Sequence, residues 1–380
     1  MSVALAGQFT TTPMTGMGGF LPLRFAPVDT DSRRSPVFEY RKTHHHQDNS
    51  GPGRERASSI WARVMRYSFQ GISDTTGRAD GMMPPRLRVG DKVRFVSPAS
   101  TPDRERVLLA AAMLENWGLK VDLGENAFRK FAYLAGTDEE RLADFNAALR
   151  DPDIRAIIAT RGGKGSYRIA DRLDFEAARH DPKFVVGFSD ISILHFSLWK
   201  HCQLIGIHGA LYGCDGGRIA EETSSSLQRL LMRSENVVIS SREEEATSAL
   251  TTTGTASGRL IGGNLDMIAT AAGWALPDLN GAILLMEAVE MYLGQVDRHL
   301  TMLRKGGHLA GVVGIAVGQF TNFKPSSGIT IIDLLRDHLG DLNVPILGGL
   351  PLGHGYSPLS VPIGSMAFLD TAARKLIIEQ

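Results

Sequence analysis

The pattern of hydrophobic and polar positions changes near residue 85. Residues 1–84 show no sustained period of either two or 3.6 residues and contain polar, Gly- and Pro-rich runs, so we predict that they are mostly disordered. Within them, residues 58–69 have the spacing of a short helix, and the three histidines at 44–46 are predicted to be solvated. From residue 85 onward, apolar runs alternate with amphipathic segments, which indicates a folded region.

The first part of this region is predicted to alternate strands with helices. Short apolar runs predict strands over 92–96, 120–123 and 154–159. Apolar positions at helical spacing predict helices over 103–117 and 138–149 between them. Apolar strands separated by helices are typical of a parallel sheet covered on both faces, so the fold class is α/β.

A polar stretch over 236–257 is predicted to connect two domains, an N-terminal one over 85–235 and a C-terminal one over 258–380. In the second domain we predict strands over 282–286, 311–317, 345–347, 361–369 and 375–378, and helices over 265–272, 295–304 and 330–339.

Composition and charge narrow the function classes. Lys plus Arg equals Asp plus Glu at 41 each, so the chain has no net charge. Its charge therefore does not indicate nucleic acid or an anionic membrane as a partner. The two cysteines, Cys202 and Cys214, lack the spacing of a zinc site and cannot form a disulfide framework. No apolar run approaches the ~18 residues that span a bilayer, and no secretory leader pattern is present. We therefore expect a cytoplasmic protein without metal or cofactor.

Two loops follow predicted strands at the sheet edge where parallel sheets bind ligands. The first, residues 160–166, reads Thr-Arg-Gly-Gly-Lys-Gly-Ser and precedes a helix predicted over 167–173. Its glycines allow close approach of a ligand to backbone amides, but their spacing does not match a phosphate-binding P-loop. The alternative is that these glycines only turn the chain.

The second loop carries Ser189. It follows the apolar run 184–187 and precedes an amphipathic segment, so Ser189 is predicted to lie on a strand-to-helix turn. Such a turn exposes a hydroxyl, and amides at a helix start can stabilise an oxyanion. The alternative is that Ser189 only caps the helix.

A nucleophilic serine needs a base and an acid that orients the base. Of the eleven histidines, His354 lies in a glycine-flanked loop after a strand and is the stronger candidate; His208 could instead be a hydrogen-bonded core residue. Glu287, which ends an apolar run, is the candidate acid, with Glu290 as its competitor. The order Ser, Glu, His is that of α/β-hydrolases, yet Ile191 replaces the second glycine of their G-x-S-x-G motif.

At these residues the sequence resembles the LD-carboxypeptidases of serine peptidase family S66, a group that also contains microcin C self-immunity proteins. The resemblance covers about residues 87–380. It rests on Ser97-Pro98-Ala99-Ser100, the run 136–146 beginning Gly-Thr-Asp-Glu-Glu-Arg, Arg161-Gly162-Gly163-Lys164-Gly165, Gly187-Phe188-Ser189-Asp190, Gly262-Gly263-Asn264-Leu265, Leu285-Met286-Glu287, and Gly353-His354 followed by Val361-Pro362-Ile363-Gly364.

The resemblance implies a metal-independent serine peptidase. By this resemblance Ser189 is the nucleophile, His354 the base and Glu287 its orienting acid, and the backbone amides of Gly163 and Asp190 form the oxyanion hole. It further implies an N-terminal parallel-sheet domain of the flavodoxin or glutamine-amidotransferase type and a smaller C-terminal α/β domain that supplies the acid and the base. The expected assembly is a homodimer, and the expected substrate is a murein tetrapeptide that loses its terminal D-alanine.

One departure concerns the glycine loop. An aromatic residue often follows the Gly-Gly pair in this family, and Lys164 stands there instead; its ammonium could pair with the carboxylate of the substrate. We predict Arg161, Lys164 and His208 as substrate contacts. Two other functions remain open, a microcin-immunity type of carboxypeptidase acting on an aminoacyl or peptidyl nucleotide, and a catalytically silent peptide-binding module.

Overall fold

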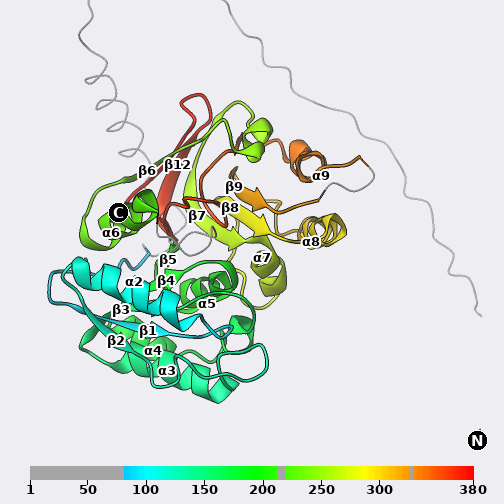
Figure 1. Cartoon of the computed structure of the whole chain (residues 1–380). Helices are drawn as coiled ribbons and strands as arrows, with labels where there is room; N and C mark the ends of the chain where they lie inside the picture. Colours follow the sequence, from blue (N-terminus) through cyan, green and yellow to red (C-terminus); the bar gives the residue numbers. More distant parts are fainter. Residues whose placement is uncertain (1–80, 212–219, 325–327) are drawn as a thin grey trace, which may run out of the picture. The chain divides into compact units, whose positions relative to one another are not determined.

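The structure is a computed structural model, and it describes residues 81–211, 220–324 and 328–380 (Figure 1). The expected helix over 58–69 and the histidines at 44–46 lie outside the described residues, as does Cys214. The described residues belong to one compact unit, which contains two sheets.

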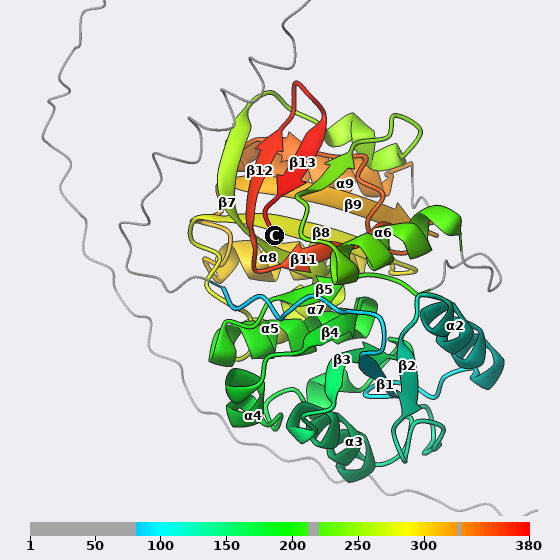
Figure 2. The same cartoon turned by 90° about the vertical axis from the view of Figure 1, so that its left-hand side faces the viewer.

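The first sheet has six strands in the order β11-β5-β4-β3-β1-β2. Its strands are β1 Lys92–Val96, β2 Lys120–Leu123, β3 Ile154–Ala159, β4 Phe184–Gly187, β5 Gly206–His208 and β11 Val361–Ile363. The first five pair in parallel, and β11 pairs antiparallel with β5. Figure 2 shows β11, in red, beside β5. The predicted α/β class with a parallel N-terminal sheet is confirmed.

Helices cover both faces of this sheet, because neighbouring strand residues point to opposite sides. Buried apolar residues of β3 point alternately to the two faces of the sheet. Ile157 belongs to the cluster that includes α3 Asp138–Arg150, α4 Phe175–His180 and α5 Ser192–Cys202. Ile158 belongs to the cluster on the other face, which includes α2 Arg104–Asn116 and α6 Glu221–Met232. The later strands, such as β3 and β4, are therefore apolar on both sides, as the sequence predicted, whereas the edge strand β2 is largely exposed.

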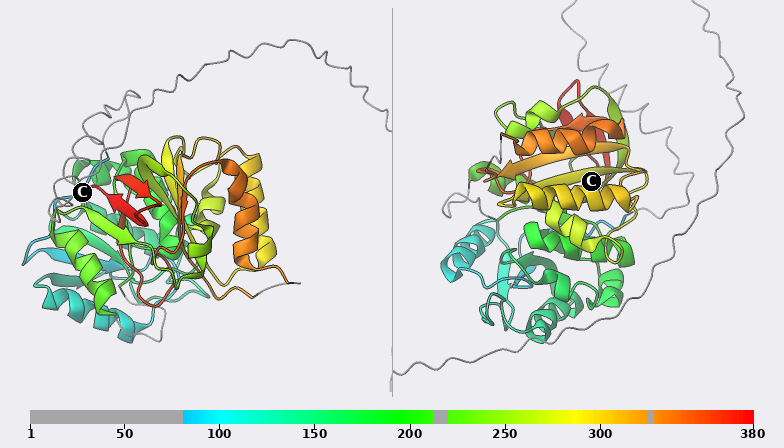
Figure 3. Two further views of the ribbon diagram at one scale, coloured as in Figure 1. Left: turned by 90° about the horizontal axis from the view of Figure 1, so that it is seen from above. Right: turned by 90° about the vertical axis from the view of Figure 1, so that its right-hand side faces the viewer.

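The second sheet has seven strands in the order β10-β9-β8-β7-β12-β13-β6. Its strands are β6 Val237–Ser240, β7 Thr255–Asn264, β8 Ala282–Val289, β9 Gly314–Thr321, β10 Ile346–Leu347, β12 Met366–Asp370 and β13 Lys375–Ile378. Strands β7 to β10 are parallel, whereas β12, β13 and β6 pair antiparallel. The helices of this half are α7 Leu265–Ala271, α8 Leu293–Lys305 and α9 Ile331–Leu339. Figure 3 shows α8 and α9 side by side over one face of the sheet.

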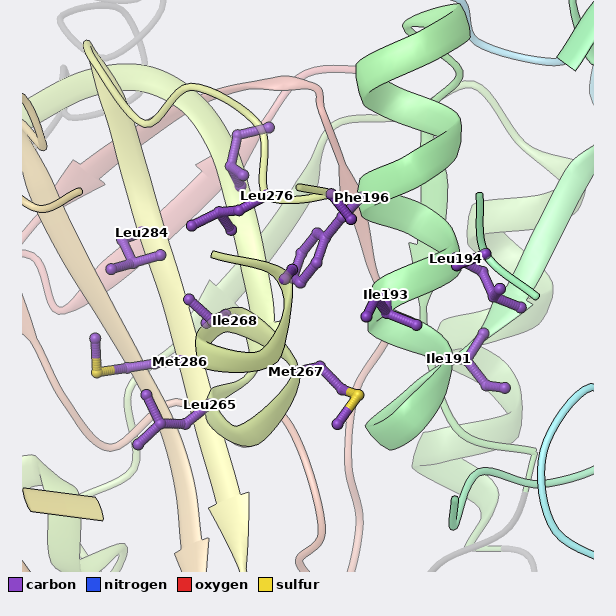
Figure 4. Packing of buried hydrophobic residues seen from close by; sticks show 14 of the residues in the cluster. Ile191, Ile193, Leu194, Phe196, Leu265, Met267, Ile268, Leu276, Leu284 and Met286 are labelled. Atoms are coloured by element: carbon purple, nitrogen blue, oxygen red, sulfur yellow. The ribbon is translucent and has the colours of Figure 1, made fainter. Parts of the chain in front are cut away.

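The two halves share one cluster of buried apolar residues. It extends from α3, α4 and α5 of the first half to α7, α8 and α9 of the second. In Figure 4, Ile193 and Phe196 of α5 face Met267 and Ile268 of α7, behind which lies Met286 of β8. The two halves are thus joined by a continuous apolar core.

Several predicted elements differ in extent. The helix expected over 167–173 is a single 3₁₀ turn, Ser166–Arg168; the other 3₁₀ segments are Ser189–Ile191, Ala246–Leu250 and Gly340–Leu342. The strand expected over 361–369 is two strands, because Gly364 turns the chain with a φ of 108°. Among the residues described, no helix has the length and apolar character needed to cross a membrane.

Candidate active site

Ser189 lies on a strained turn after β4. Its φ is 62°, in the left-handed region that non-glycine residues seldom adopt. Its side chain caps no helix, since the N-cap of α5 is Ile191 and lacks a side-chain cap. The capping alternative therefore does not hold. Such strain concentrates at functional sites, and it is the backbone conformation of a nucleophile turn.

The glycine loop packs directly against this turn. A methyl group at Gly162 would lie 2.8 Å from the Cβ of Ser189. The Lys164 N–H donates to Ser100 Oγ at 3.0 Å, and the Ser166 N–H donates to Asp190 Oδ2 at 2.8 Å. Burial raises the pKa of Asp190 to about 6. Among the described residues, the amides of Gly163 and Asp190 have no hydrogen-bond acceptor.

Glu287 lies inside β8, not at its end, because β8 continues to Val289. The pairing with β9 shifts register between Met286 and Ala288, because β9 has one extra residue opposite Glu287. Bulges redirect side chains and are common next to active sites. The carboxylate is fully buried and accepts a hydrogen bond from Asn264 Nδ2 at 3.2 Å.

Glu287 and His354 form a buried acid–histidine pair. His354 Nδ1 lies 2.6 Å from Glu287 Oε2, and the histidine side chain is 10% exposed. Burial lowers the pKa of His354, but the charge and hydrogen bond of Glu287 outweigh it, so the pKa is raised. Burial likewise raises the pKa of Glu287, and His354 more than reverses this. The pairing uses Nδ1, and Nε2 is the ring nitrogen outside the pair.

Phe188 brings the serine turn beside this pair. Its ring centroid lies 4.8 Å from that of His354, and Ser189 is the next residue. The Ser189 hydroxyl makes no hydrogen bond to a described residue, so the serine–histidine contact is not closed in this structure. The predicted Ser189, Glu287 and His354 thus lie in one region, contributed by both sheets.

The three predicted substrate contacts lie in different environments. Arg161 is exposed and donates from Nη1 to the Thr101 carbonyl at 3.3 Å, and Lys164 pairs with Asp266 at 3.1 Å. His208 is 1% exposed, and neither ring nitrogen has a hydrogen-bond partner among the described residues. Burial lowers its pKa to about 4, so it is neutral at pH 7. The hydrogen-bonded core role considered for His208 is therefore not seen.

Sequence reasoning assigned no role to Asn264 or Gln319. The Asn264 N–H donates to Ser192 Oγ at 3.2 Å, so this residue contacts both halves. Gln319 Oε1 accepts from the Gly355 N–H at 2.7 Å and so holds the loop between β10 and β11 that carries His354, here called the histidine loop. The Gly-Gly-Asn motif could have indicated a role for Asn264, whereas no sequence motif surrounds Gln319. Within the described residues, no group of three or more His, Cys, Asp or Glu side chains could hold a metal ion.

Comparison with known proteins identifies the family. Residues 93–209 match the LD-carboxypeptidase N-terminal domain and residues 257–369 the LD-carboxypeptidase C-terminal domain. The chain belongs to the LD-carboxypeptidase family S66. It is therefore a carboxypeptidase, a hydrolase of peptide bonds.

Three relatives illustrate the breadth of this family. A probable murein peptide carboxypeptidase of Bacillus subtilis is 34% identical over 304 residues, covering 78% of this chain and 94% of that protein. The crystal structure of the muramoyltetrapeptide carboxypeptidase from Oxalobacter formigenes matches with a TM-score of 0.68 and 27% identity, over 76% of this chain and 99% of that one. The microcin C7 self-immunity protein MccF of Escherichia coli is 26% identical over 325 residues, covering 77% of this chain and 94% of that protein.

Proposed function

We propose that this LD-carboxypeptidase is a cytoplasmic serine peptidase that removes the terminal D-alanine from murein tetrapeptide during cell-wall recycling. The observation that carries the proposal is the buried Glu287–His354 pair, 2.6 Å apart, beside the strained turn of Ser189. Two of the relatives compared above bear the names of murein peptide and muramoyltetrapeptide carboxypeptidases, which supports the choice of substrate.

In the acylation step, Ser189 Oγ attacks the carbonyl carbon of the bond before D-alanine, and His354 Nε2 takes the hydroxyl proton. Electrons of the carbonyl move to its oxygen, which accepts hydrogen bonds from the amides of Gly163 and Asp190. The C–N bond then breaks, and His354 returns the proton to the leaving amine. Glu287 holds the imidazole tautomer and stabilises the imidazolium.

In the second step a water molecule attacks the acyl-enzyme ester. His354 takes a proton from the water, the ester C–O bond breaks, and the proton passes to Ser189 Oγ. The products are a tripeptide and D-alanine, and the serine is restored.

The decisive experiment is mass spectrometry of murein tetrapeptide after incubation with the protein, where a loss of one alanine is expected. Ser189→Ala should reduce kcat by several orders of magnitude, leaving a residual rate from the oxyanion hole and binding. A Ser189→Ala protein that keeps more than about a tenth of wild-type turnover is incompatible with the proposal.

A second candidate is hydrolysis of an aminoacyl or peptidyl nucleotide, which the similarity to MccF favours. Incubation with a murein tetrapeptide and with an aminoacyl sulfamoyl adenosine analogue separates the two, because only the correct substrate is turned over. Binding of the tetrapeptide without turnover would indicate a silent peptide-binding module. The expected homodimer is checked by light scattering at several protein concentrations.

A further inference from the structure

Lys164 connects the glycine loop to the second half of the molecule. Its Nζ lies 3.1 Å from Oδ2 of Asp266, a residue of α7 that is 102 positions away in sequence. The lysine side chain is 58% exposed and the aspartate 29% exposed. The ammonium of Lys164 therefore has an anionic partner within this chain before any substrate arrives.

The two ends of this ion pair adjoin groups of the proposed mechanism. Lys164 directly follows Gly163, the proposed oxyanion donor, whose φ of 110° fixes the direction of the loop. Asp266 lies two residues after Asn264, which donates to Glu287 at 3.2 Å. The ion pair thus joins the segment that carries the oxyanion donor to the segment that holds the acid.

The aspartate is also fixed from its other side. Its Oδ1 lies 3.7 Å from Nε2 of His299 on α8. The histidine side chain is largely buried, and its Nδ1 has no partner among the described residues. Because α7 and α8 belong to the shared core, the carboxylate has a stable position and the lysine is the group that reaches toward it.

We propose that Lys164 and Asp266 are positioning residues that hold the glycine loop at the distance from the Glu287–His354 pair that acyl transfer requires. This inference rests on the proposed function. An exposed ion pair contributes little to the stability of the fold, so its effect should appear in turnover. Reaction rates respond to small displacements of the groups around the reacting carbonyl.

The test compares Lys164→Met and Asp266→Asn, assayed on the free-acid tetrapeptide and on its C-terminal amide. Each variant should lower kcat about two- to fivefold on both peptides and leave KM unchanged. This factor corresponds to the free energy that an exposed ion pair contributes. The double variant should be no slower than either single variant, since both changes remove the same interaction. Lys164→Arg and Asp266→Glu should retain most of the wild-type kcat.

A matched control is Lys92→Met, which removes a different exposed pair, Lys92 with Asp153 at 3.4 Å, from the far end of β1. It should leave kcat unchanged. A Lys164→Met effect confined to KM for the free acid, together with normal kcat in Asp266→Asn, would assign Lys164 to the substrate carboxylate and overturn the proposal. Additive losses in the double variant would also overturn it.

Hydrogen exchange separates this inference from the proposed function, because it requires no substrate. Amide exchange over residues 161–166 should be about two- to fivefold faster in Lys164→Met and Asp266→Asn than in the wild type or Lys92→Met. Unchanged exchange rejects the positioning role. Absence of carboxypeptidase activity in the wild type rejects the proposed function and leaves the exchange result valid.

Discussion

Glycines around Glu287 leave the space that its buried carboxylate occupies. A methyl group at Gly353 would lie 2.7 Å from Glu287 Oε2, and one at Gly318 would lie 3.2 Å from its Cβ. Gly353 also has a φ of 122°, which side chains seldom tolerate. The acid therefore depends on small residues in two neighbouring segments, β9 and the histidine loop.

Gly353→Ala should displace Glu287 from His354. A displacement near 1 Å in a catalytic group can lower kcat about a hundredfold, and we expect that order of loss in a peptide hydrolysis assay.

The control for backbone strain is Gly307→Ala, because Gly307 has a φ of 74° with no atom within 4 Å of an added methyl group. It should lower the melting temperature but leave kcat unchanged. Equal kcat losses in both glycine variants would show that strain, not contact with Glu287, is responsible.

Glu287→Gln should change the pH profile. His354 must be neutral to act as a base, so kcat/KM falls as pH drops through its raised pKa. Removing the Glu287 charge removes the main cause of that rise, so the acid limb should move to lower pH while the plateau falls by about 10⁴-fold. The measurement is kcat/KM between pH 5 and pH 9.

Glu290→Gln tests a weaker influence on the same pKa of His354. The Glu290 carboxylate also raises the pKa of His354, but as the smallest of the causes, and it is exposed. This variant should shift the acid limb slightly in the same direction and keep its plateau. An acid limb that stays in place in Glu287→Gln would exclude His354 as the titrating base.

At the scale of residues, the sequence predicted Ser189, His354 and Glu287 from residue type, loop position and family resemblance. It could not predict the extra residue of β9 opposite Glu287, because this register shift leaves the apolar pattern of β8 unchanged. The pairing of Lys164 with Asp266 was equally hidden, since it depends on how two distant segments meet.

Among the elements, α5 has the largest part in joining the two halves. Phe196 is fully buried and faces α7 across the shared core. Phe196→Ala should lower the free energy of unfolding by about 3–5 kcal/mol, measured by denaturant titration.

Leu109 on α2 is 57% exposed, so Leu109→Ala should change the free energy of unfolding by less than about 0.5 kcal/mol. A loss in Phe196→Ala as small as this would mean that α5 and α7 do not share a packed core.

The order and type of most elements followed from periodicity, since long apolar patterns are distinctive. The exceptions are short or irregular segments. Residues 167–173 have helical spacing, yet only Ser166–Arg168 forms a 3₁₀ turn. Strand β11 could not be assigned to the first sheet from sequence, because its partner β5 is more than 150 residues earlier in the chain.

For the whole molecule, we predict that residues 81–380 suffice for activity. Both sheets, the shared core and the proposed catalytic residues lie after residue 80. A variant that begins at Gly81 should keep kcat/KM within about twofold of the full chain in the same peptide assay, since no catalytic group is lost.

A variant that begins at Lys92 is the contrasting case. It removes Met82, which pairs with the segment before β5, and Leu87, whose N–H donates to the Leu231 carbonyl at 2.8 Å. This variant should melt at a lower temperature. Loss of activity in the Gly81 variant would show that residues 1–80 take part in catalysis or folding.

The return of β11 to the edge of β5 has a consequence for biosynthesis. The sheet that bears Ser189 acquires its last strand from residues 361–363, which follow β5 by more than 150 residues. A nascent chain therefore exposes the edge of β5 until residues 361–363 have been synthesised. The serine-bearing sheet cannot assume its complete form before those residues leave the ribosome.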